Sequence, residues 1–210
     1  MYDGASLMTL SERDAYLDPG AGGLNVTWGY PEGLSPGWVR ELQVGPPGGF
    51  LDQRPGEYEA VIRGYFAGFF GCPAGGVSLA PSATMAFAVA VQAIMGSPGD
   101  EFVLADCSYD SYPGLLGALG ARVRYARRQV GGVLDVASVA AACTARTRAV
   151  VVVSPDNPLG VVCPPQVWEQ LIALCRERGI TLLADHCLAE VNPRGVPVPV
   201  LPSLAAGRGL

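Results

Sequence analysis

The sequence contains no lysine, so all 14 of its basic side chains are arginines, set against 19 acidic ones. Charged residues make up only 16% of the 210 residues, and the formal net charge is −5. Nucleic-acid binding requires clustered cations. Arg127 and Arg128 form the only adjacent arginine pair. The sequence therefore predicts that the protein does not bind nucleic acid.

Residues that bind metals or form disulfides are also scarce. There is one histidine, His186, and the six cysteines show no Cys-x-x-Cys spacing, so we expect no zinc site. Scattered thiols in an apolar-rich chain are typical of a reducing cytosol. No apolar run approaches the roughly 20 residues that a membrane span needs. Residues 1–4 lack the basic start of a signal peptide. These features predict a cytoplasmic protein that does not enter a membrane.

Strand and helix patterns alternate along the middle of the sequence. Helices are expected at 55–69, 82–95, 115–119, 136–142 and 166–178, and strands at 77–79, 101–105, 121–126, 149–153 and 180–184. This alternation predicts an α/β fold with a mostly parallel sheet covered by helices on both faces, a three-layer sandwich. The helix at 82–95 is rich in alanine and almost entirely apolar, so we expect it to be buried.

Proline and glycine set the expected domain boundaries. Residues 1–50 are interrupted by both and predict an irregular N-terminal arm. The α/β pattern occupies 51–191. Prolines recur again after 191, so 192–210 is expected to be a tail or linker.

Ligands of an open parallel sheet bind beyond the carboxyl ends of its strands, so the loops at these ends are the first candidates for a site. Ser82, Ala83 and Thr84 open the helix that follows 77–79, and their N–H and hydroxyl groups suit an anion. An ordinary Ser82 N-cap explains the same pattern. Tyr109 follows the strand at 101–105, and its ring is placed either to stack on a flat ligand or to pack at the surface.

Two further polar residues follow the next two strands. Asn157 lies between Pro155 and Pro158, which restrict the backbone around it and aim its amide. A structural Asn-Pro turn is the alternative. The strand at 180–184 is apolar and is expected to be buried. Asp185 directly ends this strand, where an unpaired carboxylate is costly. The alternative interpretation of Asp185 is that its side chain caps the N-terminus of a helix.

Taken together, these loops supply an anion cradle, an aromatic ring, an amide and a carboxylate at one edge of the sheet. Pyridoxal 5′-phosphate is a planar, cationic and phosphorylated aromatic molecule that needs this set. A carboxylate at the position of Asp185 would keep its ring nitrogen protonated and so preserve the electron sink.

On these residues the sequence resembles the large domain of fold-type I, class I/II aminotransferase-like pyridoxal-phosphate enzymes, from about residue 24 to about 191. The resemblance implies that residues 82–84 form the phosphate-binding turn and that Tyr109 stacks on the cofactor ring. Residues 157–160, Asn-Pro-Leu-Gly, resemble the family's Asn-Pro-Thr-Gly box, whose asparagine bonds the ring hydroxyl. Asp185 would pair with the pyridine nitrogen.

Within this family, residues 24–26, 34–37, 53–55 and 109–111 resemble a small branch that oxidises or hydroxylates free L-arginine in the biosynthesis of unusual amino acids. Leu188 stands three residues after Asp185, where ordinary aminotransferases have a tyrosine that bonds the ring hydroxyl. This departure weakens assignment as a plain transaminase.

The family holds its cofactor as a Schiff base to a lysine some tens of residues beyond the aspartate, and the sequence ends at Leu210 without one. We therefore assign no catalytic residue and expect the N-terminal part of an amino-acid enzyme whose C-terminal part is missing. The expected partner is a complementing C-terminal chain or a second copy of this chain. The resemblance implies the second arrangement, a homodimer. The alternative is a non-catalytic relic or partner subunit that binds the cofactor weakly or not at all. The presence of Tyr109, Asn157 and Asp185 favours the enzyme.

Overall fold

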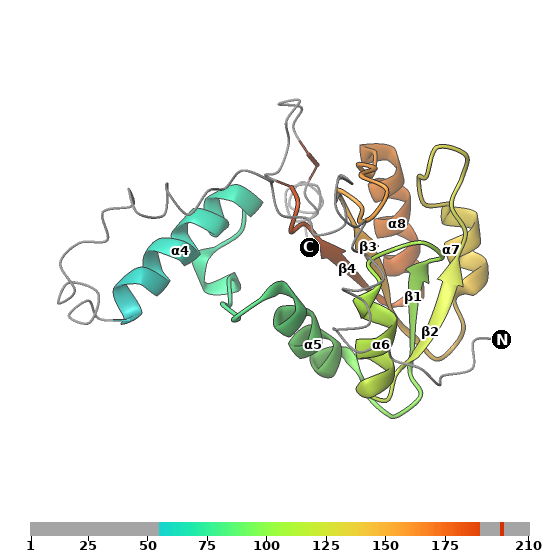
Figure 1. Cartoon of the computed structure of the whole chain (residues 1–210), viewed down its shortest axis with the longest axis horizontal. Coiled ribbons are helices and arrows are strands. Elements are labelled where there is room, and N and C mark those ends of the chain that lie inside the picture. The colour runs from blue at the N-terminus through green and yellow to red at the C-terminus, as the bar shows by residue number, and fades with distance from the viewer. Residues whose placement is uncertain (1–54, 190–197, 200–210) are drawn as a thin grey trace, which may run out of the picture. The chain divides into compact units, whose positions relative to one another are not determined.

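The computed structural model describes residues 55–189 and 198–199 (Figure 1). The expected arm at 1–50 lies outside the described residues, as does nearly all of the expected tail at 192–210. The helices are α4 (Pro55–Phe70), η1 (Ala74–Gly76, a 3-10 turn), α5 (Ala83–Ile94), α6 (Ser111–Ala118), α7 (Val136–Ala142) and α8 (Pro165–Arg178). The strands are β1 (Glu101–Ala105), β2 (Arg122–Ala126), β3 (Thr147–Val153) and β4 (Thr181–Asp185). Among the described helices, none has the length and apolar character needed to traverse a bilayer.

The four strands form one parallel sheet in the order β2-β1-β3-β4. From β1 the chain first crosses to β2 on one side, and then returns past β1 to add β3 and β4 on the other. The direction of winding therefore changes between β1 and β3. In open parallel sheets such a switch point separates the loops at the carboxyl edge and leaves a crevice for ligands.

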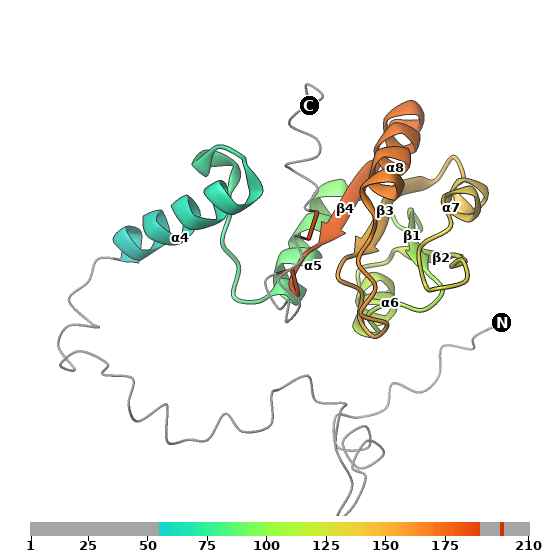
Figure 2. The same ribbon diagram turned by 90° about the horizontal axis from the view of Figure 1, so that it is seen from above.

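Helices cover both faces of the sheet because side chains alternate along each central strand. Val103 and Val150 face the layer formed by α7 and α8, where Trp168 is fully buried. Phe102 and Val151 face the layer formed by α5 and α6. The sheet lies between these two helix pairs (Figure 2). The predicted α/β sandwich with a parallel sheet is confirmed.

The expected burial of the helix at 82–95 is wrong in part. Only Phe87 and Val91 of α5 are buried, whereas Met85 and Val89 are 49% and 58% exposed. Alanine and valine are common on both the packed and the unpacked side of this helix, so composition alone overestimates its burial. One face packs on the sheet, and no described element covers the other.

Two strand predictions also need correction. Residues 77–79 pair with no strand in the described part of the chain, and a strand exists only where a neighbour completes its ladder. β4 was expected to be buried but is half-buried, because it lies at the edge of the four described strands. The helix expected at 115–119 begins earlier, at Ser111, as α6, because Pro113 is tolerated in the first turn of a helix.

Candidate functional site

Five of the six residues singled out from the sequence line one pocket of about 230 Å³ at the carboxyl edge of the sheet. These five are Ala83, Thr84, Tyr109, Asn157 and Asp185. We call this cavity, whose lining also includes Tyr112, Val153, Cys187 and Leu188, the edge pocket. Its walls come from the start of α5, the β1–α6 loop, the β3–α8 loop and the end of β4, so it spans the switch point. The sixth residue, Ser82, is the N-cap of α5.

The start of α5 provides hydrogen-bond donors at the edge pocket. Ser82 Oγ accepts from the Met85 N–H at 3.2 Å, so the ordinary N-cap interpretation is correct for Ser82. The first intrahelical bond runs from Ala86 N to Ser82 O, which leaves the N–H groups of Ala83 and Thr84 without an intrahelical acceptor. These two N–H groups and the Thr84 hydroxyl lie at the positive end of a helix, where an anion is favoured.

Asp185 is the last residue of β4 and is half-buried. Its Oδ2 accepts from Tyr112 Oη at 2.5 Å, and its Oδ1 accepts from Cys187 N at 2.8 Å. These neutral donors reduce the cost of placing a carboxylate here without neutralising its charge. The residues that follow, up to 189, form a turn, so within the described chain Asp185 is not a helix N-cap. A carboxylate has about four lone-pair sites, so Asp185 can accept a further hydrogen bond from a ligand.

Tyr112 is a site residue that sequence reasoning missed. Its ring stacks on Phe87 with centroids 3.9 Å apart, and the edge of Tyr109 meets it at 5.1 Å. Burial and the bond to Asp185 raise the pKa of Tyr112 well above its usual range, so its hydroxyl stays protonated and donates. Tyr112 therefore fixes both the Asp185 carboxylate and the wall formed by Tyr109. Nothing in the local sequence distinguishes it from a packing tyrosine.

Asn157 lies in the exposed part of the β3–α8 loop, between the cis peptide bonds of Ser154–Pro155 and Asn157–Pro158. The buried Asp156 organises this loop. Its Oδ1 accepts from Leu159 N at 3.3 Å, and its backbone exchanges hydrogen bonds with Val161 and Gly160. The loop is thus a structural Asn-Pro turn that also places Asn157 in the lining of the edge pocket.

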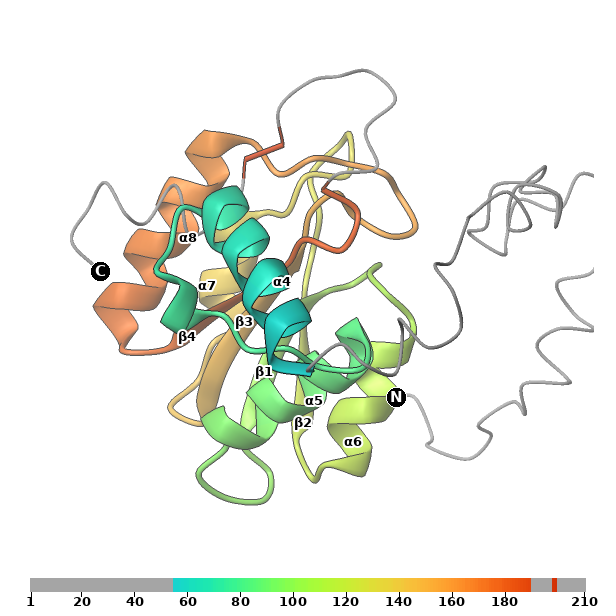
Figure 3. The same ribbon diagram turned by 90° about the vertical axis from the view of Figure 1, so that its left-hand side faces the viewer.

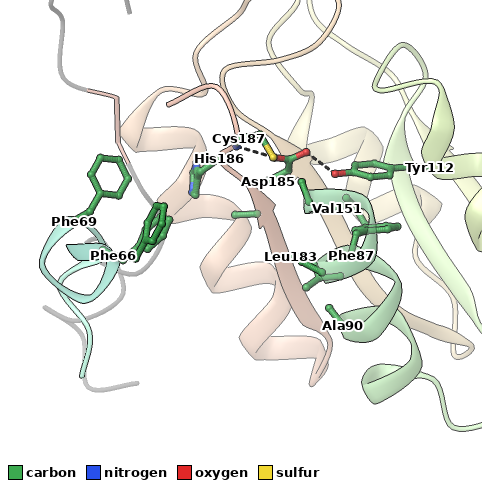
Figure 4. Close-up of a pocket in the computed structure, with 14 residues that line it drawn as sticks. Phe66, Phe69, Phe87, Ala90, Tyr112, Val151, Leu183, Asp185, His186 and Cys187 are labelled. Atoms are coloured by element: carbon green, nitrogen blue, oxygen red, sulfur yellow. Dashed lines mark hydrogen bonds between the residues drawn. The ribbon is translucent and has the colours of Figure 1, made fainter. Parts of the chain in front are cut away.

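A larger cavity of about 570 Å³ adjoins the edge pocket and shares Ala83, Tyr112, Asp185 and Cys187 with it. We call it the apolar hollow. Its lining comes mainly from α4, α5, β3 and β4. Figure 3 is viewed from the α4 side and shows α4 in front of the sheet. Phe66 and Phe69 lie at one end, and the Asp185–Tyr112 hydrogen bond lies at the other (Figure 4). Because its lining is mainly apolar, the apolar hollow is the weaker candidate for the polar chemistry.

Cys187 and His186 follow Asp185 but are not activated as nucleophile or cation. Burial and the neighbouring Asp185 carboxylate raise the pKa of the Cys187 thiol to about 12, so the thiol is protonated at neutral pH. Burial lowers the pKa of His186, whose Nδ1 lies 2.9 Å from the Ser154 carbonyl oxygen. Within the described ranges, no group of three or more His, Cys, Asp or Glu side chains is arranged to hold a metal ion.

Several curated proteins are similar to this chain. An arginine–pyruvate transaminase of Pseudomonas aeruginosa is 36% identical over 110 residues, which is 48% of this chain and 28% of that protein. A Mycobacterium tuberculosis protein assigned as an N-succinyldiaminopimelate aminotransferase is 33% identical over 176 residues, 79% of this chain and 44% of that protein. The chain therefore spans less than half the length of either relative.

Solved structures share the fold. An aspartate aminotransferase double mutant of Thermus thermophilus superposes with a TM-score of 0.53 and 33% identity, covering 58% of this chain and 31% of that one. A PLP-bound, aminotransferase-like protein of Clostridium difficile gives a TM-score of 0.65 over 74% of this chain and 41% of that one. At 12% identity, the second shows the fold alone.

The sequence profile of the family "Aminotransferase class I and II" matches residues 69–191. This segment contains all four described strands and every residue of the edge pocket. The match covers more than half of the chain and agrees with the similar sequences and folds. The chain belongs to the class I and II aminotransferase family.

Proposed function

We propose that this chain forms the cofactor-binding part of a pyridoxal-phosphate-dependent, aminotransferase-like enzyme that acts on a free amino acid. One observation carries the proposal. Thr84, Tyr109, Asn157 and Asp185 are far apart in the sequence, yet all four line the edge pocket. Family membership supports the proposal, and so does the similar fold of the PLP-bound protein.

The groups of the edge pocket fit those of pyridoxal phosphate. The first N–H groups of α5 and the Thr84 hydroxyl would hold the phosphate, because a helix N-terminus favours an anion. Ser82, the N-cap next to the lining, would add its hydroxyl as a further donor. The Asn157 amide would donate to the ring hydroxyl, and the ring of Tyr109 would cover one face of the pyridine. Asp185, with acceptor capacity beyond its two bonds, would accept from the protonated ring nitrogen. When bound, the cofactor supplies an electron sink for carbanion chemistry at the amino-acid Cα.

The amine that anchors the cofactor must come from outside these 210 residues, which contain no lysine. We propose that it is supplied by a C-terminal polypeptide, either continuous with this chain or separate from it, and that the assembled enzyme is a cytoplasmic homodimer. An amine of this kind also moves the Cα proton, so this chain on its own lacks the general base. The position of β4 at an edge of the described sheet is compatible with added strands.

A non-catalytic partner subunit or relic is the second candidate. No arginine lines the edge pocket, so a bound phosphate would have no cationic partner there among the described residues. Under this candidate, affinity for pyridoxal phosphate would be weak or absent. Binding measurements on the full chain separate the two.

We further propose L-arginine as the amino acid, oxidised or hydroxylated rather than transaminated, with molecular oxygen as the external oxidant that accepts the electrons. Leu188 lines the edge pocket at the position where ordinary aminotransferases carry a tyrosine, and its side chain cannot donate a hydrogen bond to the ring hydroxyl. The name of the similar Pseudomonas aeruginosa protein, arginine–pyruvate transaminase, makes arginine a natural first substrate to test.

Titration of the full chain with pyridoxal phosphate and with pyridoxal tests the proposal. The phosphate form is expected to bind at least about ten-fold more tightly, because the α5 N-terminus recognises the anion. Thr84→Val is expected to reduce this preference while leaving pyridoxal binding unchanged. Thr181→Val, an exposed threonine at the opposite end of β4, is the matched control. Equal affinities for the two compounds would contradict the assigned phosphate site.

A further inference from the structure

Arg128 lies outside the edge pocket but contacts two of the loops that form it. We propose that Arg128 is a positioning residue that fixes the Tyr109 loop and the Asn157 loop relative to each other and so sets the width of the pocket. The effect on cofactor affinity rests on the proposed function, whereas the effect on the two loops does not.

The hydrogen bonds of Arg128 reach three backbone segments. Its Nε donates to Cys107 O at 2.8 Å, and its Nη1 donates to Gly132 O at 2.7 Å. Its Nη2 contacts Cys107 O and Asp156 Oδ2, both at 2.5 Å. Cys107 is two residues before Tyr109, and Asp156 immediately precedes Asn157. One guanidinium therefore joins the two loops that carry these pocket residues.

The ion pair between Arg128 and Asp156 is buried, with side-chain exposures of 11% and 2%. Removing one partner of a buried pair leaves the other charge uncompensated, which strongly disfavours the native arrangement. Asp156 also accepts from Leu159 N within the same loop, so a change at Arg128 is transmitted to the turn that holds Asn157.

Residues 128–134 form a short hairpin, which makes a second contact with the Asn157 loop. Arg128 pairs with Leu134 in a short antiparallel bridge, and the turn between them contains Gly132 with φ +83°. A Cβ at Gly132 would lie 2.9 Å from Val161 Cγ2 and 3.4 Å from Leu159 Cδ1. The backbone of the turn thus packs directly against the end of the loop, independently of the ion pair.

The geometry of these bonds requires arginine. The guanidinium presents five N–H donors in a planar fork, whereas a lysine ammonium is a compact charge that cannot reach three separated acceptors with the same orientation. Arg128→Lys therefore keeps the charge but loses the simultaneous contact with both loops.

The pair of Arg148 and Asp100 provides a matched control. Arg148 Nε lies 3.0 Å from Asp100 Oδ2, and Asp100 is buried. This pair joins the beginning of β3 to the turn before β1, at the amino edge of the sheet. It is likewise an ion pair between an arginine and a buried aspartate, with Arg148 44% exposed, but it is remote from the edge pocket.

The test compares Arg128→Lys and Arg148→Lys in the full chain by amide hydrogen exchange without ligand and by pyridoxal phosphate titration. Arg128→Lys is expected to speed exchange about ten-fold in both 107–113 and 155–161, to leave β1 and β3 protected, and to weaken cofactor binding about ten-fold. Arg148→Lys should change neither loop. If Arg128→Lys loses its fold, Asp156→Asn, which removes the charge of the Arg128 partner but keeps an oxygen acceptor, is expected to speed exchange in 155–161.

Unchanged exchange in either loop of a folded Arg128→Lys protein would overturn the proposal, as would equal effects of Arg148→Lys on both loops. For Asp156→Asn, unchanged exchange in 155–161 of a folded protein would do the same. Faster exchange in both loops, combined with no pyridoxal phosphate binding by the unmodified chain, would support the positioning role and reject the proposed cofactor site.

Discussion

Replacing Asp185 with asparagine is expected to weaken pyridoxal phosphate binding about 10- to 100-fold, because a charge-assisted hydrogen bond contributes about 1.5–3 kcal/mol. Asparagine keeps the shape of the side chain and can still accept from Tyr112 Oη, so the Tyr109 wall should remain in place. It carries no charge, however, and cannot hold the cofactor's ring nitrogen in its protonated form.

Titration of the full-length variant, followed by the change in cofactor absorbance, measures this loss. Asp110→Asn removes an exposed carboxylate from the β1–α6 loop without touching the lining of the edge pocket, and it should bind like the unmodified chain. An Asp185→Asn protein that is folded and retains full affinity would show that Asp185 does not contact the ring nitrogen.

Borohydride reduction of the chain in the presence of pyridoxal phosphate is expected to leave no adduct on any side chain. Reduction traps the cofactor on an amine, and the sequence has no lysine to provide one. Arginine remains protonated at all accessible pH values and does not substitute. The chain alone is accordingly expected not to turn over amino acids, because neither the anchoring amine nor the Cα base is present.

Mass spectrometry of the intact protein and of its peptides measures the adduct and separates side chains from the N-terminal amino group. Arg124→Lys introduces one amine at an exposed position of β2 and shows that the chemistry detects a lysine when one is present. An adduct mapped to a side chain between 55 and 189 would mean that the chain provides its own nucleophile.

The sequence predicted the central strands well because they are buried on both faces. The β-branched run in β3 has no alternative to a covered parallel strand, and the structure buries all of it except Arg148. Asp185 was identifiable because an unpaired carboxylate is costly at the end of an apolar strand, and Asn157 because two prolines restrict the backbone around it. Both line the same pocket because β3 and β4 are parallel, so the residues that follow or end these strands lie at the same edge of the sheet.

The residues that support the site could not be predicted in the same way. Tyr112 reaches Asp185 across 73 positions of sequence, and Arg128 reaches Asp156 across 28. In each case the local pattern is that of a packing aromatic or a surface charge. The role appears only when the fold brings the partners together.

Burial was the least predictable property. Composition shows that α5 is apolar, but it does not show which face a neighbour covers, and Val89 remains exposed. The same limit applies to 77–79, whose β-strand pattern requires a pairing partner that the described residues do not provide.

The most direct test is a nuclear magnetic resonance titration of the full, isotopically labelled chain with pyridoxal phosphate. We expect the largest amide shifts at Thr84, Tyr109, Asn157 and Cys187, all around the edge pocket, and we expect them to reverse when the ligand is removed. Shifts confined to Phe66 and Phe69 of the apolar hollow, or no shifts at millimolar ligand, would contradict a cofactor pocket formed by this chain.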